Sequence, residues 1–397
     1  MSETILVLNA GSSSIKFQLF SLNARDQLNR LLKGQIEGIG AHPKLIVKGA
    51  DAQPFEEAWS AQEVASVPQA LDKLVAFLRA RLGKLPTAIG HRVVHGGPDY
   101  SEPLVIDDAV LDRLEAFAPL APLHQPNNLA PIRAVRSRQP QLLQVACFDT
   151  AFHRGHPEVA DRYALPEQLY AAGVRRYGFH GLSYEYIADR LPEIAPNVAR
   201  GRFVVAHLGS GASMCAISAG KSVESTLGFT ALDGLPMGTR PGQLDPGIVL
   251  YLMQEKGMRA RDIEHFLYNE CGLKGMSGIS NDVRDLLASK DPRAKLTLDY
   301  FTYRISLYAG MLAAAMGGID GFVFTAGIGE NAPAIREAVA GRLAWLGLDF
   351  DRESNASGKT LISRASSRVA CYVIPTDEEL MIARHTLAVL RAQRNAA

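Results

Sequence analysis

Four titratable residues stand in short segments rich in glycine and apolar residues, where a solvated surface residue is not expected. Arg92 lies in Gly90-His-Arg-Val-Val-His-Gly-Gly97, and Arg240 lies in Met237-Gly-Thr-Arg-Pro-Gly242. Asp149 follows Phe148, and His180 lies in Tyr177-Gly-Phe-His-Gly181. Arginine is seldom fully buried unless it is paired, and in a glycine-bounded turn it suits bidentate binding of a carboxylate or phosphate. A histidine beside aromatic residues is more often structural than catalytic.

Two glycine- and serine-rich turns recur about half a chain apart, each after an apolar run that is typical of a buried strand. One reads Asn9-Ala-Gly-Ser-Ser-Ser-Ile-Lys16, and the other reads His207-Leu-Gly-Ser-Gly-Ala-Ser213. An internal duplication is the simplest explanation of this pairing. Closely spaced glycines let backbone N–H groups approach a phosphate without interference from a Cβ atom, although ordinary hairpin turns use glycine too.

The elements that must position these residues alternate between strands and helices. Strands are expected at 5–20 (as strand, turn and strand), 88–94, 142–148, 203–207, 214–217, 322–325 and 369–374, and helices at 68–82, 129–138, 248–256, 260–269, 292–316, 334–343 and 378–392. The polar stretch from about 21 to 66 is expected to be irregular, and the prolines of 118–128 to prevent a continuous helix. Residues 326–331 are expected to form a glycine turn that directs backbone N–H groups toward an anion. A chain of 397 residues is longer than one hydrophobic core usually serves, so the pattern predicts an α/β protein of two domains.

The composition is balanced, with 47% hydrophobic and 21% charged residues and a net charge of +1. This balance gives no broad electrostatic footprint for nucleic acid or an anionic membrane. The apolar run before Asn9 is too short for a secretory signal, and no transmembrane helix is expected. The four cysteines are widely separated and have no C-x-x-C spacing, which is typical of reduced thiols. We therefore expect a cytoplasmic protein with no nucleic-acid or membrane partner.

Five motifs, taken in order, resemble the acetate kinase family. They are Val7–Lys16, Gly90–Gly97, Phe148–His153, Tyr177–Gly181 and Phe324–Asn331, and the resemblance continues to Ile374–Leu380. Each motif alone is weak, but their common order over the whole chain is highly specific. The resemblance implies two duplicated actin-like (ribonuclease H-like) α/β domains flanking a nucleotide cleft. Residues 1–150, joined by a C-terminal helix at about 380–397, would form one domain. Residues 151–379 would form the other, with most nucleotide contacts and the interface of a homodimer.

The resemblance also implies the reaction, which is reversible in-line transfer of the ATP γ-phosphoryl group to acetate, giving acetyl phosphate and ADP. Mg²⁺ would assist, with Mn²⁺ as an alternative. The implied roles are catalytic for Asp149, His180 and Arg240; acceptor binding for Arg92, Val94, Leu123, Phe179 and Ala231; metal association for Asn9 and Glu378, with Glu379 leaving that choice open; and nucleotide binding for Lys16, His207, Leu208, Gly209, Ser210, Gly211, Asp282, Val283, Arg284, Gly327, Ile328, Gly329, Glu330 and Asn331.

The chemistry of the acceptor bears on the role of Asp149. A small carboxylic acid with a pKa of roughly 4 to 5 is already ionised at pH 7, so its attack on phosphorus needs no general base. A hydroxyl acceptor, as in a sugar kinase, would need one. We therefore expect Asp149 to orient Mg²⁺ or its waters.

Three departures from the family pattern leave alternatives open. Ala231 stands where proline is usual, Ser210 where asparagine is common, and Pro241 where cysteine is common. One methylene in an apolar pocket changes discrimination by only about 1–3 kcal/mol, so propionate or another short-chain acid is an alternative acceptor. A non-kinase ATPase of the same fold is a further alternative, and it would hydrolyse ATP without any acid.

Overall fold

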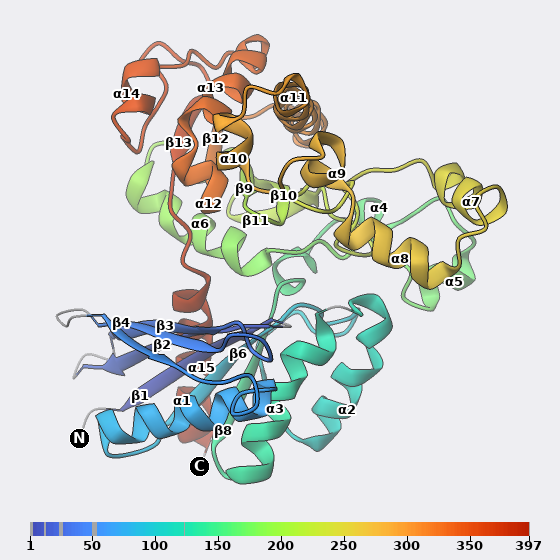
Figure 1. The fold of residues 1–397 in the computed structure, drawn as a ribbon. Helices are drawn as coiled ribbons and strands as arrows, with labels where there is room; N and C mark the ends of the chain where they lie inside the picture. Colours follow the sequence, from blue (N-terminus) through green and yellow to red (C-terminus); the bar gives the residue numbers. More distant parts are fainter. Residues whose placement is uncertain (1–2, 12, 24–26, 50–53, 123, 397) are drawn as a thin grey trace. The chain divides into compact units, whose positions relative to one another are not determined.

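The computed structural model describes residues 3–11, 13–23, 27–49, 54–122 and 124–396, and the chain forms two compact units (Figure 1). The N-terminal unit comprises Met1–Ala151 and Asp377–Ala397, and the C-terminal unit comprises Phe152–Thr376. Each unit is built around its own β-sheet. None of the helices within the described ranges has both the length and the apolar character needed to span a membrane.

The N-terminal unit contains a mixed sheet whose strands lie in the order β5-β4-β3-β2-β1-β6-β8-β7. Its elements are β1 (Thr4–Ala10), β2 (Ile15–Leu22), β3 (Leu28–Glu37), β4 (Lys44–Gly49), β5 (Phe55–Ala58), α1 (Val67–Leu82), β6 (Ala88–Val93), β7 (Leu104–Val105), α2 (Asp108–Ala116), α3 (Gln125–Arg138), β8 (Leu143–Phe148) and α15 (Glu378–Ala396). Strands β1 and β2 form a hairpin, while β6 and β8 run parallel to β1 and to each other.

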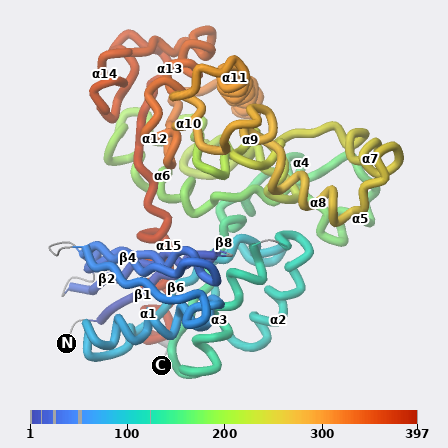
Figure 2. Tube along the Cα trace, in the orientation of Figure 1, coloured from blue at the N-terminus to red at the C-terminus, as the bar shows by residue number. Residues whose placement is uncertain are grey.

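The two faces of this sheet are covered by different helices. The main core lies between the sheet and helices α1 and α3, where Leu8, Phe17 and Leu74 are buried together. Helix α15 comes from the far end of the chain and packs on β1, β6 and β8 (Figure 2). Gly90 permits this close packing, because a Cβ atom there would lie 2.3 Å from the hydroxyl of Thr386. The last residues of the sequence therefore complete the first unit.

The C-terminal unit contains a five-stranded sheet in the order β11-β10-β9-β12-β13. Its elements are α4 (Glu158–Asp161), α5 (Glu167–Ala171), α6 (Gly181–Ile194), β9 (Arg202–Leu208), β10 (Ala212–Ser218), β11 (Lys221–Ser225), α7 (Pro246–Gln254), α8 (Ala260–Asn269), α9 (Gly272–Ser277), α10 (Val283–Ala288), α11 (Pro292–Ala315), β12 (Gly321–Thr325), α12 (Ala326–Asn331), α13 (Pro333–Arg342), α14 (Arg352–Ala356) and β13 (Ala370–Val373). Tyr184, Ile187 and Leu191 of α6 pack into the core of this sheet.

The two sheets share a five-strand topology, to which β4, β5 and β7 are added in the N-terminal sheet. In each, an antiparallel three-strand meander (β1, β2, β3 and β9, β10, β11) is followed by two strands that run parallel to its first strand. Asn9 pairs with Lys16 across the first hairpin, and His207 pairs with Ser213 across the second. The glycine- and serine-rich turns are therefore equivalent, as an internal duplication requires.

Some local expectations from the sequence were wrong. Residues 28–58 are not irregular but contain β3, β4 and β5. The inward position between Leu32 and Ile36 is Gly34, where a Cβ atom would lie 2.5 Å from the ring of Phe17, so the apolar alternation of β3 is interrupted. Helix α3 begins at Gln125, before the expected start, because a proline in the first turn needs no N–H partner. Residues 326–331 form the short helix α12 rather than an open turn.

Candidate active site

The N-terminal unit brings Arg92 and Asp149 into direct contact. Arg92 lies on β6, and Asp149 follows the end of the neighbouring parallel strand β8. The Arg92 guanidinium donates from Nε to Asp149 Oδ1 at 2.9 Å and from Nη2 to Oδ2 at 2.5 Å. Asp149 is buried, whereas the Arg92 side chain keeps 20% of its surface exposed. This bidentate pair fixes the plane of a guanidinium that still has N–H groups for a ligand.

Two further polar side chains surround this pair. Arg92 Nη1 donates to Asn9 Oδ1 on β1 at 3.4 Å, and Arg92 Nε lies 3.7 Å from Glu378 Oε2 at the start of α15. The pKa of Glu378 is raised to about 7, chiefly by burial and also by the nearby carboxylates of Asp149 and Glu379, against the opposing effect of Arg92. Burial alone would lower the pKa of Arg92, but the same carboxylates hold it above the ordinary value. The cluster therefore has more negative charge than Arg92 compensates.

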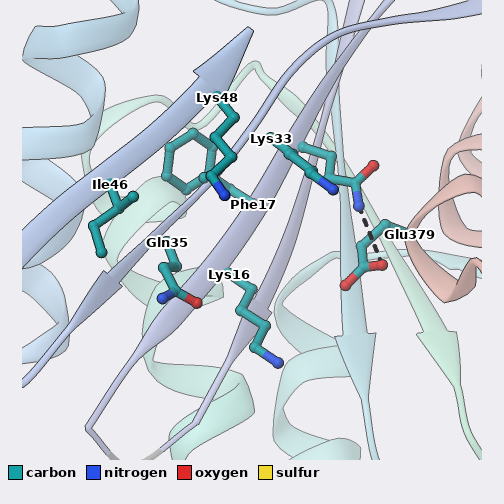
Figure 3. Close-up of a pocket in the computed structure, with 9 residues that line it drawn as sticks. Lys16, Phe17, Lys33, Gln35, Ile46, Lys48 and Glu379 are labelled. Atoms are coloured by element: carbon teal, nitrogen blue, oxygen red, sulfur yellow. Dashed lines mark hydrogen bonds between the residues drawn. The ribbon is translucent and has the colours of Figure 1, made fainter. Parts of the chain in front are cut away.

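Glu378 and Glu379 point to different surroundings. Glu379 Oε2 accepts a hydrogen bond from Gln18 Nε2 at 3.2 Å and lines a groove of about 410 Å³ over β2, β3 and β4 (Figure 3). Lys16 lines the same groove, together with Lys33, as Figure 3 shows. Glu378 contacts Arg92 instead. Of the two glutamates, Glu378 is therefore the one that belongs to the Arg92 cluster.

The C-terminal unit places His180 and His207 face to face. Their ring centroids lie 4.2 Å apart with an angle of 14° between the planes. Nδ1 of His180 lies 2.8 Å from the hydroxyl of Ser213, and Nδ1 of His207 lies 2.8 Å from the hydroxyl of Ser183. His180 adopts a φ of 59° immediately before α6, a left-handed conformation that is uncommon outside glycine. Such a costly conformation in a polar cluster is typical of functional sites.

Arg240 approaches the second glycine turn beside His180. A Cβ atom on Gly211 would lie 2.9 Å from Arg240 Nη2 and 3.4 Å from His180 Nε2, so the observed position of the Arg240 guanidinium requires that residue 211 have no side chain. Arg240 Nη1 donates to the carbonyl oxygen of Ala231 at 2.7 Å. Among the described residues no carboxylate lies within ion-pair distance of Arg240, and burial lowers the pKa of its guanidinium. This cation is therefore available to an anionic ligand.

A cavity of about 400 Å³ opens beside the same turn. Its lining includes eight of the residues expected to contact a nucleotide: Gly209, Ser210, Asp282, Val283, Arg284, Gly327, Ile328 and Asn331. Asn281 and Ala332 complete the lining and were missed, because each lies one residue outside a segment that the family resemblance marks, Asp282–Arg284 or Gly327–Asn331. The backbone N–H of Gly238 donates to the carbonyl of Ser210 at 3.1 Å, which ties the turn that carries Arg240 to this cavity.

Other residues from the expected nucleotide set lie outside that lining. Leu208 is buried, and Gly211 faces Arg240 and His180. Glu330 accepts a hydrogen bond from the backbone N–H of Thr376 at 3.2 Å, so its side chain has a structural partner. Lys16 belongs to the N-terminal unit, in the groove of Figure 3. These residues support the site or lie apart from the cavity.

The residues expected around an acyl group are divided between the units. Val94 is buried in the N-terminal unit, where its backbone N–H donates to Asn128 Oδ1 at 2.9 Å. Phe179 is buried in the C-terminal unit, and Ala231 there is partly exposed. Leu123 lies outside the described residues.

Arg336 of α13 is a site-supporting residue that sequence reasoning missed. It is almost fully buried, and its Nη1 donates to the carbonyl oxygens of Gly329 at 2.9 Å and Glu330 at 2.8 Å. Its Nε donates to Asn355 Oδ1 at 2.6 Å. The arginine thus holds the end of α12, which lines the cavity. The available signal was an arginine on the apolar face of a helix, beside Ile335.

The chain is similar to known proteins over nearly its whole length. The profile of the acetokinase family matches residues 4–384. An acetate kinase from Nitrobacter hamburgensis is 61% identical over 98% of this chain and 96% of its own length. The crystal structure of Porphyromonas gingivalis acetate kinase has a TM-score of 0.87 at 37% identity, covering 98% of this chain and 100% of that one. A propionate kinase from Francisella tularensis has a TM-score of 0.90 at 37% identity, covering 97% of this chain and 99% of that one. The predicted fold class, two duplicated actin-like α/β domains, is confirmed by these structures.

Proposed function

This chain belongs to the acetokinase family, and on that premise we propose that it transfers the γ-phosphoryl group of ATP reversibly to acetate. The observation that supports this most directly is Arg240, a cation without a carboxylate partner among the described residues, which meets His180 at Gly211 beside the cavity. A cationic group held in this way is preorganised for the oxygens of a transferring phosphoryl group.

Phosphoryl transfer depends on positioning and on neutralising charge, because its transition state is loose and in line. A carboxylate oxygen of acetate forms the new bond to the γ-phosphorus, and the bond to the β-phosphate oxygen breaks, so that ADP leaves with that oxygen. Arg240 and His180 bind the equatorial oxygens of the group in transit. Gly209, Ser210 and the other lining residues of the cavity bind the nucleotide.

Arg92 binds the acetate carboxylate in this mechanism. Its guanidinium is held by Asp149 at 2.5 and 2.9 Å, so the aspartate orients the donor that the substrate meets. Asp149 therefore has two roles in this proposal, since it orients Arg92 and also orients Mg²⁺ or its waters. A general base is not needed, since acetate is ionised at pH 7.

The N-terminal cluster also suits a divalent cation, which we propose to be Mg²⁺, with Mn²⁺ as an alternative. Asn9, Asp149 and Glu378 offer amide and carboxylate oxygens, the donors that Mg²⁺ prefers. The raised pKa of Glu378, caused first by burial, indicates a carboxylate that a cation would stabilise. In the described part of the chain, no three His, Cys, Asp or Glu side chains gather as a metal cage, so phosphate oxygens and water would complete the coordination. When bound, the ion neutralises charge on the phosphates.

Propionate is the second candidate acceptor. The similarity to a propionate kinase, with a TM-score of 0.90, is comparable to that with the acetate kinase structure. Ala231 also removes the ring volume that proline would supply at this position in the family. A longer acyl chain is then easier to accommodate, although one methylene is worth only about 1–3 kcal/mol.

We further propose that the protein is a homodimer. Helix α7 has no buried residue, and it exposes Ile248, Leu250, Tyr251 and Met253 by 43 to 54%. Such an apolar face is typical of a subunit interface, and a second copy of the chain is the proposed occupant. A Leu250→Asp/Met253→Asp variant is expected to elute as a monomer in light-scattering chromatography at a concentration where the unmodified chain is a dimer. A monomeric unmodified chain would contradict the proposal.

The reaction takes place, in this proposal, in the cytoplasm, where ATP is available. The four cysteines are free thiols, and Cys147, Cys215 and Cys371 are buried. A reducing compartment keeps such thiols in this state.

Hydroxylamine trapping of the acyl phosphate tests the function directly. Mg-ATP is offered with acetate, propionate, butyrate or glycerol, and kcat/KM is compared. The proposal expects acetate to be preferred, and activity to disappear with EDTA and return with Mg²⁺. A preference for propionate would identify propionate, the second candidate, as the acceptor. ATP hydrolysis without any acid, and without a trapped product, would exclude both.

A further inference from the structure

The hydroxyl groups of Ser213 and Tyr184 form a hydrogen-bonded chain that ends at Nδ1 of His180. Ser213 Oγ lies 2.8 Å from His180 Nδ1 and 2.5 Å from the phenolic oxygen of Tyr184. Ser213 lies on β10 and Tyr184 on α6, and both side chains are completely buried in the C-terminal unit. Neither residue lines the cavity, and neither was expected to have a role in the reaction.

We propose that Ser213 and Tyr184 are positioning residues that set the tautomer of His180, so that its Nε2 carries the proton and donates to the transferring phosphoryl group. The kinetic part of this inference rests on the proposed function. A neutral imidazole has one N–H donor and one bare acceptor nitrogen, and a serine hydroxyl has one hydrogen to donate. In the arrangement that we propose, the Tyr184 hydroxyl donates to Ser213 and the serine hydrogen points to His180 Nδ1, so the imidazole proton is on Nε2; the 2.5 and 2.8 Å contacts of Ser213 accommodate this direction.

The position of Nε2 makes this tautomer useful. Nε2 faces Gly211, where a Cβ atom would lie 3.4 Å away, and Arg240 Nη2 reaches the same point. A phosphoryl oxygen there needs hydrogen-bond donors, and a bare Nε2 would present a lone pair to it instead. Fixing the tautomer beforehand removes that repulsion and leaves two donors side by side.

The neighbouring histidine has the opposite arrangement. Ser183 donates its hydrogen to Thr376 Oγ1 at 2.8 Å, so its oxygen can only accept from His207 Nδ1 at 2.8 Å. His207 therefore carries its proton on Nδ1. The two stacked rings are thus held in opposite tautomers by two different serines, which is a specific pattern that can be measured.

Nitrogen NMR of the full-length protein with ¹⁵N-labelled histidine tests the tautomers without any substrate. The His180 and His207 signals are assigned from the His180→Gln and His207→Gln variants. We expect a bare Nδ1 and protonated Nε2 for His180, and the reverse for His207. In Ser213→Ala the ¹⁵N chemical shift of the unprotonated Nδ1 of His180 should move to that of a nitrogen that accepts no hydrogen bond. A protonated Nδ1 on His180 in the unmodified protein, in either the other tautomer or the imidazolium, would overturn the proposal.

Kinetics test the consequence. Ser213→Ala should lower kcat about 10-fold, which is near the upper range for one hydrogen bond, while both KM values stay within about twofold. Tyr184→Phe, which keeps the packing, should lower kcat in the same direction. The matched control is Ser363→Ala, because Ser363 is a buried serine of the same unit whose hydroxyl accepts a hydrogen bond from the backbone N–H of Cys371 at 3.0 Å and does not line the cavity; its kcat should be unchanged. Equal kcat values for Ser213→Ala and Ser363→Ala would refute the positioning role. If the unmodified protein forms no acyl phosphate, the proposed function fails, and the NMR result still decides the tautomers.

Discussion

Replacing Arg240 by methionine is expected to stabilise the protein while removing its activity. Arg240 is partly buried, donates one hydrogen bond to Ala231 at 2.7 Å, and has no carboxylate within ion-pair distance among the described residues. Burial lowers the pKa of the guanidinium, which means that the fold disfavours its charge. A residue that destabilises the fold is expected to be retained for function.

The size of the effect follows from two opposing contributions. Removing an uncompensated, partly buried charge should gain about 2–3 kcal/mol, less than the several kcal/mol that full burial costs. Losing the hydrogen bond to Ala231 should cost about 1 kcal/mol. The net gain in the free energy of unfolding is then about 1–2 kcal/mol, or roughly 2–8 °C in Tm for a unit of this size. The rate constant kcat should fall at least about 10²-fold, as it does when a preorganised donor is removed.

The assay combines urea unfolding with acyl phosphate trapping on the same preparations. Arg154→Met is the matched control, because burial lowers the pKa of Arg154 as well, but Arg154 pairs with Asp161 at 3.2 Å and its loss would leave that buried carboxylate without this partner. Breaking that buried pair should destabilise the protein by about 3–5 kcal/mol, which is the opposite sign. Inorganic phosphate should raise the Tm of the unmodified protein more than that of Arg240→Met. If Arg240→Met is less stable than the unmodified protein, Arg240 is a structural anchor and the reasoning fails.

Three more changes probe the same site and its support. Arg92→Leu should raise KM for acetate at least about 10-fold and leave KM for ATP nearly unchanged, because the guanidinium that donates two hydrogen bonds to the acetate carboxylate is lost. Steady-state kinetics with each substrate varied in turn measure both constants, and an unchanged KM for acetate would mean that acetate binds elsewhere. Gly211→Ala should lower kcat about 10²-fold with an unchanged circular dichroism spectrum, since the new Cβ atom would lie 2.9 Å from Arg240 Nη2; full activity would place the reaction away from this turn. Burial lowers the pKa of His153 to about 3 and of His156 to about 2, from 6.5, so both favour the neutral form in the fold. Their stabilisation is complete above pH 6.5 and is lost as the pH falls below it, by about 3 kcal/mol between pH 7.5 and 5.5. His156→Gln should remove about half of that loss in urea unfolding, and an unchanged acid sensitivity would assign it to other groups.

The sequence predicted the elements with strong apolar patterns. Buried runs such as Phe203–His207 and periodic helices such as Ala260–Asn269 were placed closely, because their patterns are local. It missed β3 to β5, where Gly34 and outward polar residues break the alternation, and it missed α6, which contains Pro192. The burial that stabilises these elements comes from packing partners distant in sequence, so no local pattern shows it.

The sequence likewise determined which chemical groups the site contains. The glycine turns, the two arginines in glycine-bounded segments and the order of the motifs were enough to indicate phosphoryl transfer to a carboxylate, and the family is confirmed. The role of each residue remains a proposal. Residue types and motif order are properties of the chain itself, and they need no fold to be seen.

The tertiary structure alone decided which of these groups meet. Arg92 contacts Asp149 because β6 and β8 are parallel neighbours whose ends coincide, a pairing 57 residues apart in the chain. Ser213 contacts Nδ1 of His180 because the register of β9 and β10 fixes the position of Ser213, and because His180 lies immediately before α6, which packs on this sheet. Arg336 supports the cavity through carbonyl oxygens, which every residue has. Contacts of this kind are fixed by strand register and helix packing, and these arise only when the whole unit folds.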